Sequence, residues 1–134
     1  MSYEIIDHTA DLRMRVSGSS PEELFESAVA GMMFILKKNP REREVVRRQI
    51  KVDSVNFTTL LIDFLNEVLS LVETHKEIYT KVRFGKLDEK SVRAELKGTV
   101  QESFDEDIKA VTYHEAQVKK NKESEWETML VFDI

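Results

Sequence analysis

Acidic groups stand near both ends of the chain, and their chemistry suits a divalent cation. Asp11 closes the cluster Asp7-His8-Thr9-Ala10-Asp11, and Asp133 precedes Ile134, whose main-chain carboxylate is a third anionic group. Calcium takes roughly six to eight oxygen ligands at about 2.3 to 2.6 Å, and carboxylates supply many of them. If an early strand lies beside the last one, we expect Asp11, Asp133 and Ile134 to form a compact set of oxygen ligands.

The spacing of apolar residues supports this arrangement. Apolar residues recur at even positions from Ile6 to Val16 and again from Trp126 to Phe132, which predicts two half-buried strands. Asp11 and Asp133 occupy odd positions, so pairing of these strands would place both carboxylates on the side of the sheet away from the helices. A bulge in either strand would shift this parity. The alternative is that both are solvated surface carboxylates, the common situation of aspartate.

Two histidines offer a second kind of chemistry. His8 and His114 fall on even, inward positions of their predicted strands. A histidine there can be a general acid, a general base or a metal ligand, because imidazole titrates near neutral pH. The alternative is a core histidine with satisfied hydrogen bonds. A small metal-dependent phosphoester hydrolase would use His114 with Asp11 and Asp133, but no nucleophile, phosphate loop or His-Glu-x-x-His motif accompanies them.

Composition limits the class of protein. A length of 134 residues with 41% hydrophobic content predicts one domain over residues 1–134. The net charge of -5 argues against direct, tight binding of nucleic acid. The absence of cysteine excludes a thiolate zinc site and fits a reducing cytoplasm. No signal peptide and no run of about 20 apolar residues is present, so we expect a soluble, cytoplasmic protein without a membrane segment.

Periodicity predicts two helices and six strands. The first helix covers residues 21–36, with Ser20 as N-cap and Glu23 completing a capping box. The second covers residues 56–75 and has one apolar stripe. Strands are predicted at residues 6–16, 44–52, 78–84, 92–96, 108–118 and 126–132. The order predicts an α+β fold, a two-layer sandwich in which two helices pack on one face of a mixed or antiparallel sheet.

Three segments, taken together with the two helices, resemble the archease family. They are Asp7-His8-Thr9-Ala10-Asp11, Asp107-Ile108-Lys109-Ala110-Val111-Thr112-Tyr113-His114 and Val131-Phe132-Asp133-Ile134. Each segment is short, but their joint order and spacing are specific, and the resemblance covers essentially the whole chain. The chain departs from the family in having aspartate at positions 7 and 107, where glutamate is common. It also lacks the histidine-containing segment that often precedes position 107.

The resemblance implies a non-catalytic partner of the tRNA-splicing ligase, which joins a 2′,3′-cyclic phosphate or 3′-phosphate end to a 5′-hydroxyl end. This ligase is a manganese enzyme that first takes GMP from GTP onto its own histidine. An archease is expected to promote this guanylylation, to allow repeated turnover and to relax the choice of nucleoside triphosphate.

The resemblance also implies a metal site, with calcium held by Asp11, Asp133 and the main-chain carboxylate of Ile134. Manganese is an alternative, because carboxylate oxygens suit both ions. A second partner suggested by relatives is a tRNA methyltransferase, for which the protein would be a chaperone-like modulator. The net charge of -5 favours contact with a basic enzyme over contact with RNA.

Overall fold

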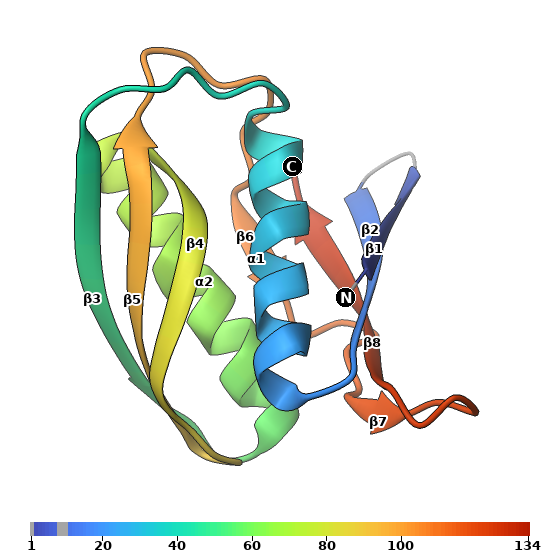
Figure 1. Ribbon diagram of the computed structural model, residues 1–134. Coiled ribbons are helices and arrows are strands. Elements are labelled where there is room, and N and C mark those ends of the chain that lie inside the picture. Colours follow the sequence, from blue (N-terminus) through green and yellow to red (C-terminus); the bar gives the residue numbers. More distant parts are fainter. Residues whose placement is uncertain (1, 8–10) are drawn as a thin grey trace.

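The computed structural model describes residues 2–7 and 11–134, which form two antiparallel sheets and two helices (Figure 1). The first sheet has the strand order β1-β2-β8-β6, with β7 also paired to β8, and the second has the order β3-β5-β4. The helices are α1 (Pro21–Leu36) and α2 (Phe57–His75). The strands are β1 (Ser2–Asp7), β2 (Asp11–Gly18), β3 (Val45–Asp53), β4 (Glu77–Leu87), β5 (Ser91–Val100), β6 (Ala110–Thr112), β7 (Lys119–Lys120) and β8 (Trp126–Asp133).

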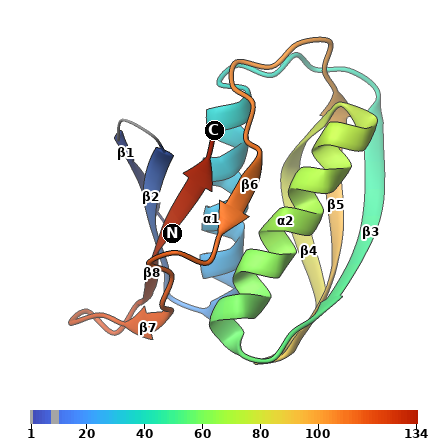
Figure 2. The same ribbon diagram turned by 180° about the vertical axis from the view of Figure 1, so that it is seen from behind.

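The two helices lie between the two sheets. Helix α1 contacts β1, β2 and β8 of the first sheet and β4 of the second, while α2 contacts β6 of the first and all three strands of the second. Figures 1 and 2 show the helix pair from opposite sides, with one sheet on each flank. The predicted α+β class and antiparallel pairing are confirmed. The structure also shows that the strands are divided between two sheets. This division was not predicted, because the alternation of apolar and polar residues reveals a buried face but does not reveal which sheet a strand joins.

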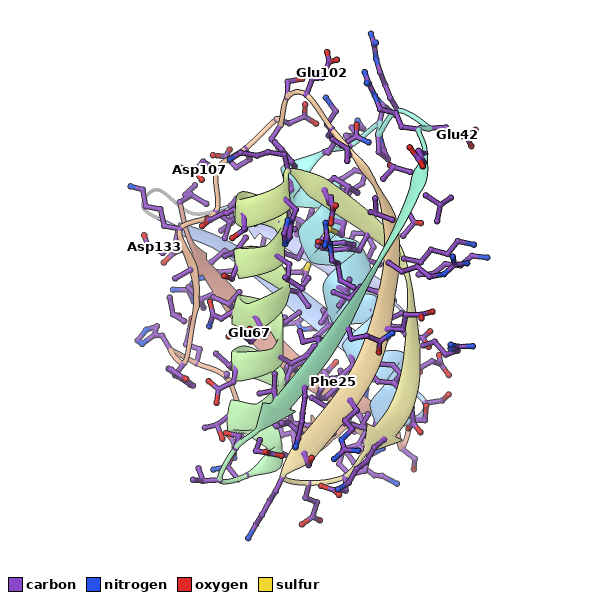
Figure 3. The ribbon with its side chains drawn as sticks, turned by 90° about the vertical axis from the view of Figure 1, so that its left-hand side faces the viewer. Phe25, Glu42, Glu67, Glu102, Asp107 and Asp133 are labelled. Carbon is purple, nitrogen blue, oxygen red and sulfur yellow. The ribbon has the colours of Figure 1, made fainter. Side chains whose placement is uncertain are left out.

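Both helices pack as predicted, α1 begins at the predicted cap Ser20, and α2 begins at Phe57, one residue later than predicted. The Ser20 hydroxyl accepts a hydrogen bond from the N–H of Glu23 at 3.1 Å, and Asn56 caps α2 by accepting from the N–H of Thr59 at 2.9 Å. The predicted apolar stripes are buried in one hydrophobic core, which includes Phe25, labelled in Figure 3, and Phe64. No helix in the described part of the chain combines the length and apolar character needed to cross a bilayer.

The N-terminal strand prediction was wrong in its extent. Residues 6–16 do not form one strand, because β1 and β2 pair antiparallel with Ile5 opposite Met14. This register places odd positions of β1 on the same side as even positions of β2, so Ile5 packs against the core where Ile6 was expected. The apolar alternation continues on both sides of the reversal and therefore hides it. His8 and Ala10, predicted to face inward, lie outside the described residues.

The strand predicted over residues 108–118 was also wrong. Of this segment only Ala110–Thr112 forms a strand, β6, which pairs with β8 and whose buried side chain is Val111, at an odd position. His114 is exposed, and Glu115 has a positive φ of 61°. The even parity that placed His114 inward is therefore wrong already within β6, and the chain leaves the sheet after Thr112.

Gly98 provides a test of the second sheet. A Cβ at this position would lie 2.7 Å from the carbonyl carbon of Ile78 and 2.8 Å from the Cα of Tyr79, which are main-chain atoms of the paired strand. At Gly85 the nearest atom is the carbonyl oxygen of Arg93, at 3.9 Å. We expect Gly98→Ala to lower the free energy of unfolding by about 3 kcal/mol and Gly85→Ala to change it by less than about 1 kcal/mol. Urea denaturation measures both, and equal effects would contradict the β4–β5 register.

Candidate metal-binding site

The start of the second strand and the end of the last strand meet where β2 pairs with β8. In this antiparallel pair Asp11 lies directly opposite Asp133. Directly opposed residues project from the same face, with Cβ atoms about 5 Å apart. The Asp11 side chain is 25% exposed and Asp133 is exposed, so the pair lies at the surface, although Oδ1 of Asp11 is buried. The predicted neighbourhood of Asp11 and Asp133 is therefore present.

Along the other edge of β8, strand β6 holds Asp133 in place. Ala110 lies opposite Asp133, and the N–H of Lys109 donates to the carbonyl oxygen of Asp133 at 2.7 Å. The half-buried side chain of Ile134 packs against the hydrophobic core. This contact keeps the main chain of Ile134 beside the aspartate pair. Figure 3 shows Asp107, exposed and two residues before Lys109, at the same edge of the molecule as Asp133.

Asn66 of α2 positions β6, a role that sequence reasoning missed. Its amide donates to the carbonyl oxygen of Val111 at 2.8 Å and accepts from the N–H of Val111 at 2.9 Å. The side chain thus pairs with both main-chain groups of a residue in the short strand beside Asp133. The available signal was a polar amide close to the apolar stripe of a helix, a position where an unpaired amide would be costly.

Tyr113, which follows β6, makes a second contact with α2. Its hydroxyl donates to a carboxylate oxygen of Asp63, and the other Asp63 oxygen accepts from the Ser54 hydroxyl at 2.9 Å. The hydrogen bond to Asp63 raises the pKa of Tyr113 above its ordinary value. Strand β6 and the residue that follows it are thus held to α2 at Val111 and at Tyr113.

Arg13 brings a cation to Asp11, a contact that no pattern in the sequence predicts. Its Nε lies 3.6 Å from Oδ1 of Asp11, and its guanidinium also contacts the carboxylate of Glu115. Glu115 follows β6, so Arg13 links β2 to the loop after β6, which lies on the other side of β8. A divalent ion bound by Asp11 would share this carboxylate with Arg13, and the guanidinium would lower the affinity of the site for the ion.

The donor chemistry fits a hard divalent cation. Two carboxylates face the same side of the sheet, and the main-chain oxygens of Ile134 are beside them, which are the oxygen ligands that calcium prefers. Within residues 2–7 and 11–134, no three histidine, aspartate or glutamate side chains are grouped closely enough to hold a metal. His114 therefore does not join Asp11 and Asp133. The remaining ligands of a bound ion would be main-chain oxygens, water or groups of a partner.

The fold and this acidic pair define a small α+β protein in which an early strand and the last strand carry one candidate cation site. Residues 3–134 match the model of the Archease protein family (MTH1598/TM1083), so the chain belongs to the archease family. Among curated relatives, "Protein archease" of Methanosarcina barkeri is 30% identical over 140 residues, covering 98% of this chain and 95% of that protein. The Pyrococcus furiosus protein of the same description is 28% identical, covering 98% of each chain.

Two solved structures share the fold. The solution structure of protein 1598 of Methanobacterium thermoautotrophicum has a TM-score of 0.75 and 23% sequence identity, covering 98% of both chains. The crystal structure of a Thermotoga maritima protein, described as an archease and possible chaperone, has a TM-score of 0.70 and 20% identity, covering 96% of this chain and 94% of that one. At these identities the likeness concerns the fold alone.

Proposed function

We propose that this protein is a non-catalytic, metal-binding activator of the tRNA-splicing ligase. It would promote the transfer of GMP from GTP onto the ligase, allow repeated turnover and alter the choice of nucleoside triphosphate. Membership of the archease family supports the general role. The observation that carries the proposal is the direct cross-strand pairing of Asp11 with Asp133, next to Ile134.

The ion of this proposal is calcium, with manganese as the alternative, held by Asp11, Asp133 and the main-chain oxygens of Ile134. A bound cation would neutralise two carboxylates that otherwise repel each other across the strands. Only two side-chain ligands are found in the described part of the chain, which leaves coordination positions for oxygen atoms of a partner. The anchoring of β6 by Asn66 keeps this acidic edge in one conformation, as a docking surface requires.

Two other functions make different predictions for the purified protein. A hydrolase that uses Asp11, Asp133 and His114 would turn over a phosphoester by itself and would lose this activity in Asp11→Asn. The exposure of His114 and its absence from a metal-binding group give that function little support. A chaperone-like modulator of a tRNA methyltransferase would co-purify with that enzyme alone, whereas the proposed activator would co-purify with the ligase.

The experiment that tests the proposal is a GMP-loading assay without RNA. A ligase of this class is mixed with GTP and manganese, and the fraction of ligase carrying GMP is measured with and without the protein. We expect the loaded fraction and the loading rate to increase when the protein is added. Equal loading in the two reactions would overturn the proposal.

A further inference from the structure

The outer face of the β3-β5-β4 sheet carries a regular array of cationic side chains. The pairing of β3 and β4 with the central strand β5 places nine residues in three rows across the sheet. The rows are Arg47-Lys97-Lys81, Gln49-Glu95-Arg83 and Lys51-Arg93-Lys86. We call these nine residues the basic grid. It contains seven cations and a single carboxylate, although the whole chain has a net charge of -5.

The basic grid lies on the side of the sheet away from the helices. Residues that alternate with it along the strands, such as Ile50, Ala94 and Leu96, are buried in the core. Figure 3 views this sheet with its three strands in front of α1 and with α2 beside them. Seven of the nine grid residues are exposed, and Glu95 and Lys97 are half-buried; the side chains of Arg47 and Arg83 are 59% and 82% exposed.

Glu95 organises the centre of the grid but offsets little of its charge. Its carboxylate lies 3.4 Å from the guanidinium of Arg83 and 3.8 Å from that of Arg47, and it accepts from the Gln49 amide at 3.0 Å. At one corner, Lys86 lies 3.7 Å from Asp88. No carboxylate of the described residues forms an ion pair with the other four cations of the grid. The face therefore keeps a concentrated positive charge.

The spacing of the grid suits an extended polyanion. Alternate residues along an antiparallel strand are about 6.8 Å apart, and neighbouring strands are about 4.8 Å apart, so the cations form a flat, repeating pattern. Like charges at this spacing repel one another, and a series of phosphates would relieve this repulsion while releasing counterions. Arginine and lysine are the side chains that most often meet nucleic-acid phosphates.

The composition of the grid disfavours other ligands. None of its nine residues is apolar or aromatic. A membrane-binding face needs apolar groups that enter the lipid, and a stable protein interface needs a core with few charges. Base stacking needs aromatic rings, so this face has no means of reading unpaired bases. The ligand class that remains is a phosphodiester backbone bound without sequence preference.

We propose that the basic grid binds the phosphate backbone of RNA. The choice of RNA rests on the proposed function, which places this protein beside an enzyme that acts on tRNA, whereas the affinity for phosphates rests on the grid alone. The net charge of -5 predicted no tight binding because it averages over the chain. In the structure seven of the 20 lysines and arginines gather on one sheet face, with Glu95 as the one carboxylate among them.

Fluorescence anisotropy with a labelled, single-stranded RNA of mixed sequence tests the proposal. The test variant is Lys51→Gln/Lys81→Gln/Lys97→Gln. The control, Lys76→Gln/Lys119→Gln/Lys122→Gln, changes the net charge equally at exposed lysines outside the grid. We expect the test variant to bind about tenfold more weakly than wild type or worse, and its slope of log affinity against log salt to fall by about 2. The control should stay within about twofold of wild type.

Three results would overturn the proposal. They are no binding of RNA by the wild type at about 50 mM salt, equal weakening by the two triple variants, or tighter binding to phosphatidylserine vesicles than to RNA. Thermal unfolding of each variant verifies that it is folded. The binding assay contains neither ligase nor GTP, and the GMP-loading assay contains no RNA, so the failure of one proposal is distinguishable from the failure of the other.

Discussion

Replacing Arg48 with methionine is expected to lower the free energy of unfolding by about 3 kcal/mol or more, because it leaves a buried carboxylate without its cation. Glu77 is only 1% exposed and accepts two hydrogen bonds from Arg48, at 2.9 Å from Nε and 2.7 Å from a terminal nitrogen. Tyr79 donates a third at 2.8 Å. These contacts connect β3 with β4 across the central strand β5, which contains Gly98. They therefore stabilise the second sheet.

The cost of Arg48→Met should depend on pH. The hydrogen bonds from Arg48 lower the pKa of Glu77, while burial opposes them. In the wild type this pair stabilises the fold above the ordinary pKa of glutamate, and the contribution disappears as pH falls through the lower folded-state pKa. In the variant, burial without Arg48 raises the pKa of Glu77, so protonation relieves the buried charge. We therefore expect the stability difference, measured by urea unfolding, to narrow between about pH 7 and pH 4.

Glu77→Gln is the matched control for this prediction. It leaves the Arg48 side chain, which is 33% exposed and can turn its guanidinium to water, so the loss should be smaller than that of Arg48→Met. Equal losses in the two variants, or a difference that does not change with pH, would show that the buried charge is not what Arg48 stabilises.

Replacing Asp133 with asparagine should have opposite effects with and without calcium. Without calcium, removal of one of two directly opposed carboxylates relieves repulsion, so the free energy of unfolding should rise by about 0.5 kcal/mol. With calcium, a site that loses one of its two side-chain ligands should bind about a hundredfold more weakly, and stabilisation by the ion should be largely lost. Calorimetric titration and thermal unfolding measure the two effects, and Asp11→Asn should weaken calcium binding similarly.

Glu127→Gln is the control for the aspartate variants. Glu127 lies on the same strand and on the same face as Asp133, but opposite Ser17. The substitution Glu127→Gln removes the same charge as Asp133→Asn but leaves the proposed ligands intact. The calcium affinity should therefore change by less than about twofold, through weak long-range electrostatics alone. Equal loss in Glu127→Gln and Asp133→Asn would mean that calcium responds only to surface charge.

The helices and the shared face of the two aspartates could be predicted because local signals encode them, whereas the pairing of β2 with β8 entered the prediction only as a condition. Ser20 and the apolar stripe of α2 act within a few residues, and the odd parity of Asp11 and Asp133 follows from a period of two. The division of the strands into two sheets could not be predicted, since either sheet buries one face against the helices. The reversal between β1 and β2 escaped for a similar reason, because alternation continues on both sides of it.

The surroundings of the candidate site could not be predicted because they depend on contacts between distant segments. Arg13 and Glu115 are 102 positions apart, and Asn66 is 45 positions from Val111. His114 was placed inward by an even parity, but the buried residue of β6 is the odd-numbered Val111 and the strand ends at Thr112. The basic grid was hidden because its cations come from three strands, each of which has an ordinary mixture of charges in the sequence.

The central claim is that the pair formed by Asp11 and Asp133 is what activates the ligase, and GMP loading of the ligase tests it most directly. The loaded fraction is measured with GTP and manganese in the presence of wild type, Asp11→Ala, Asp133→Ala or Glu127→Gln. We predict stimulation by wild type and Glu127→Gln and the loss of stimulation in both aspartate variants, each verified to be folded. Full stimulation by either aspartate variant would contradict the claim.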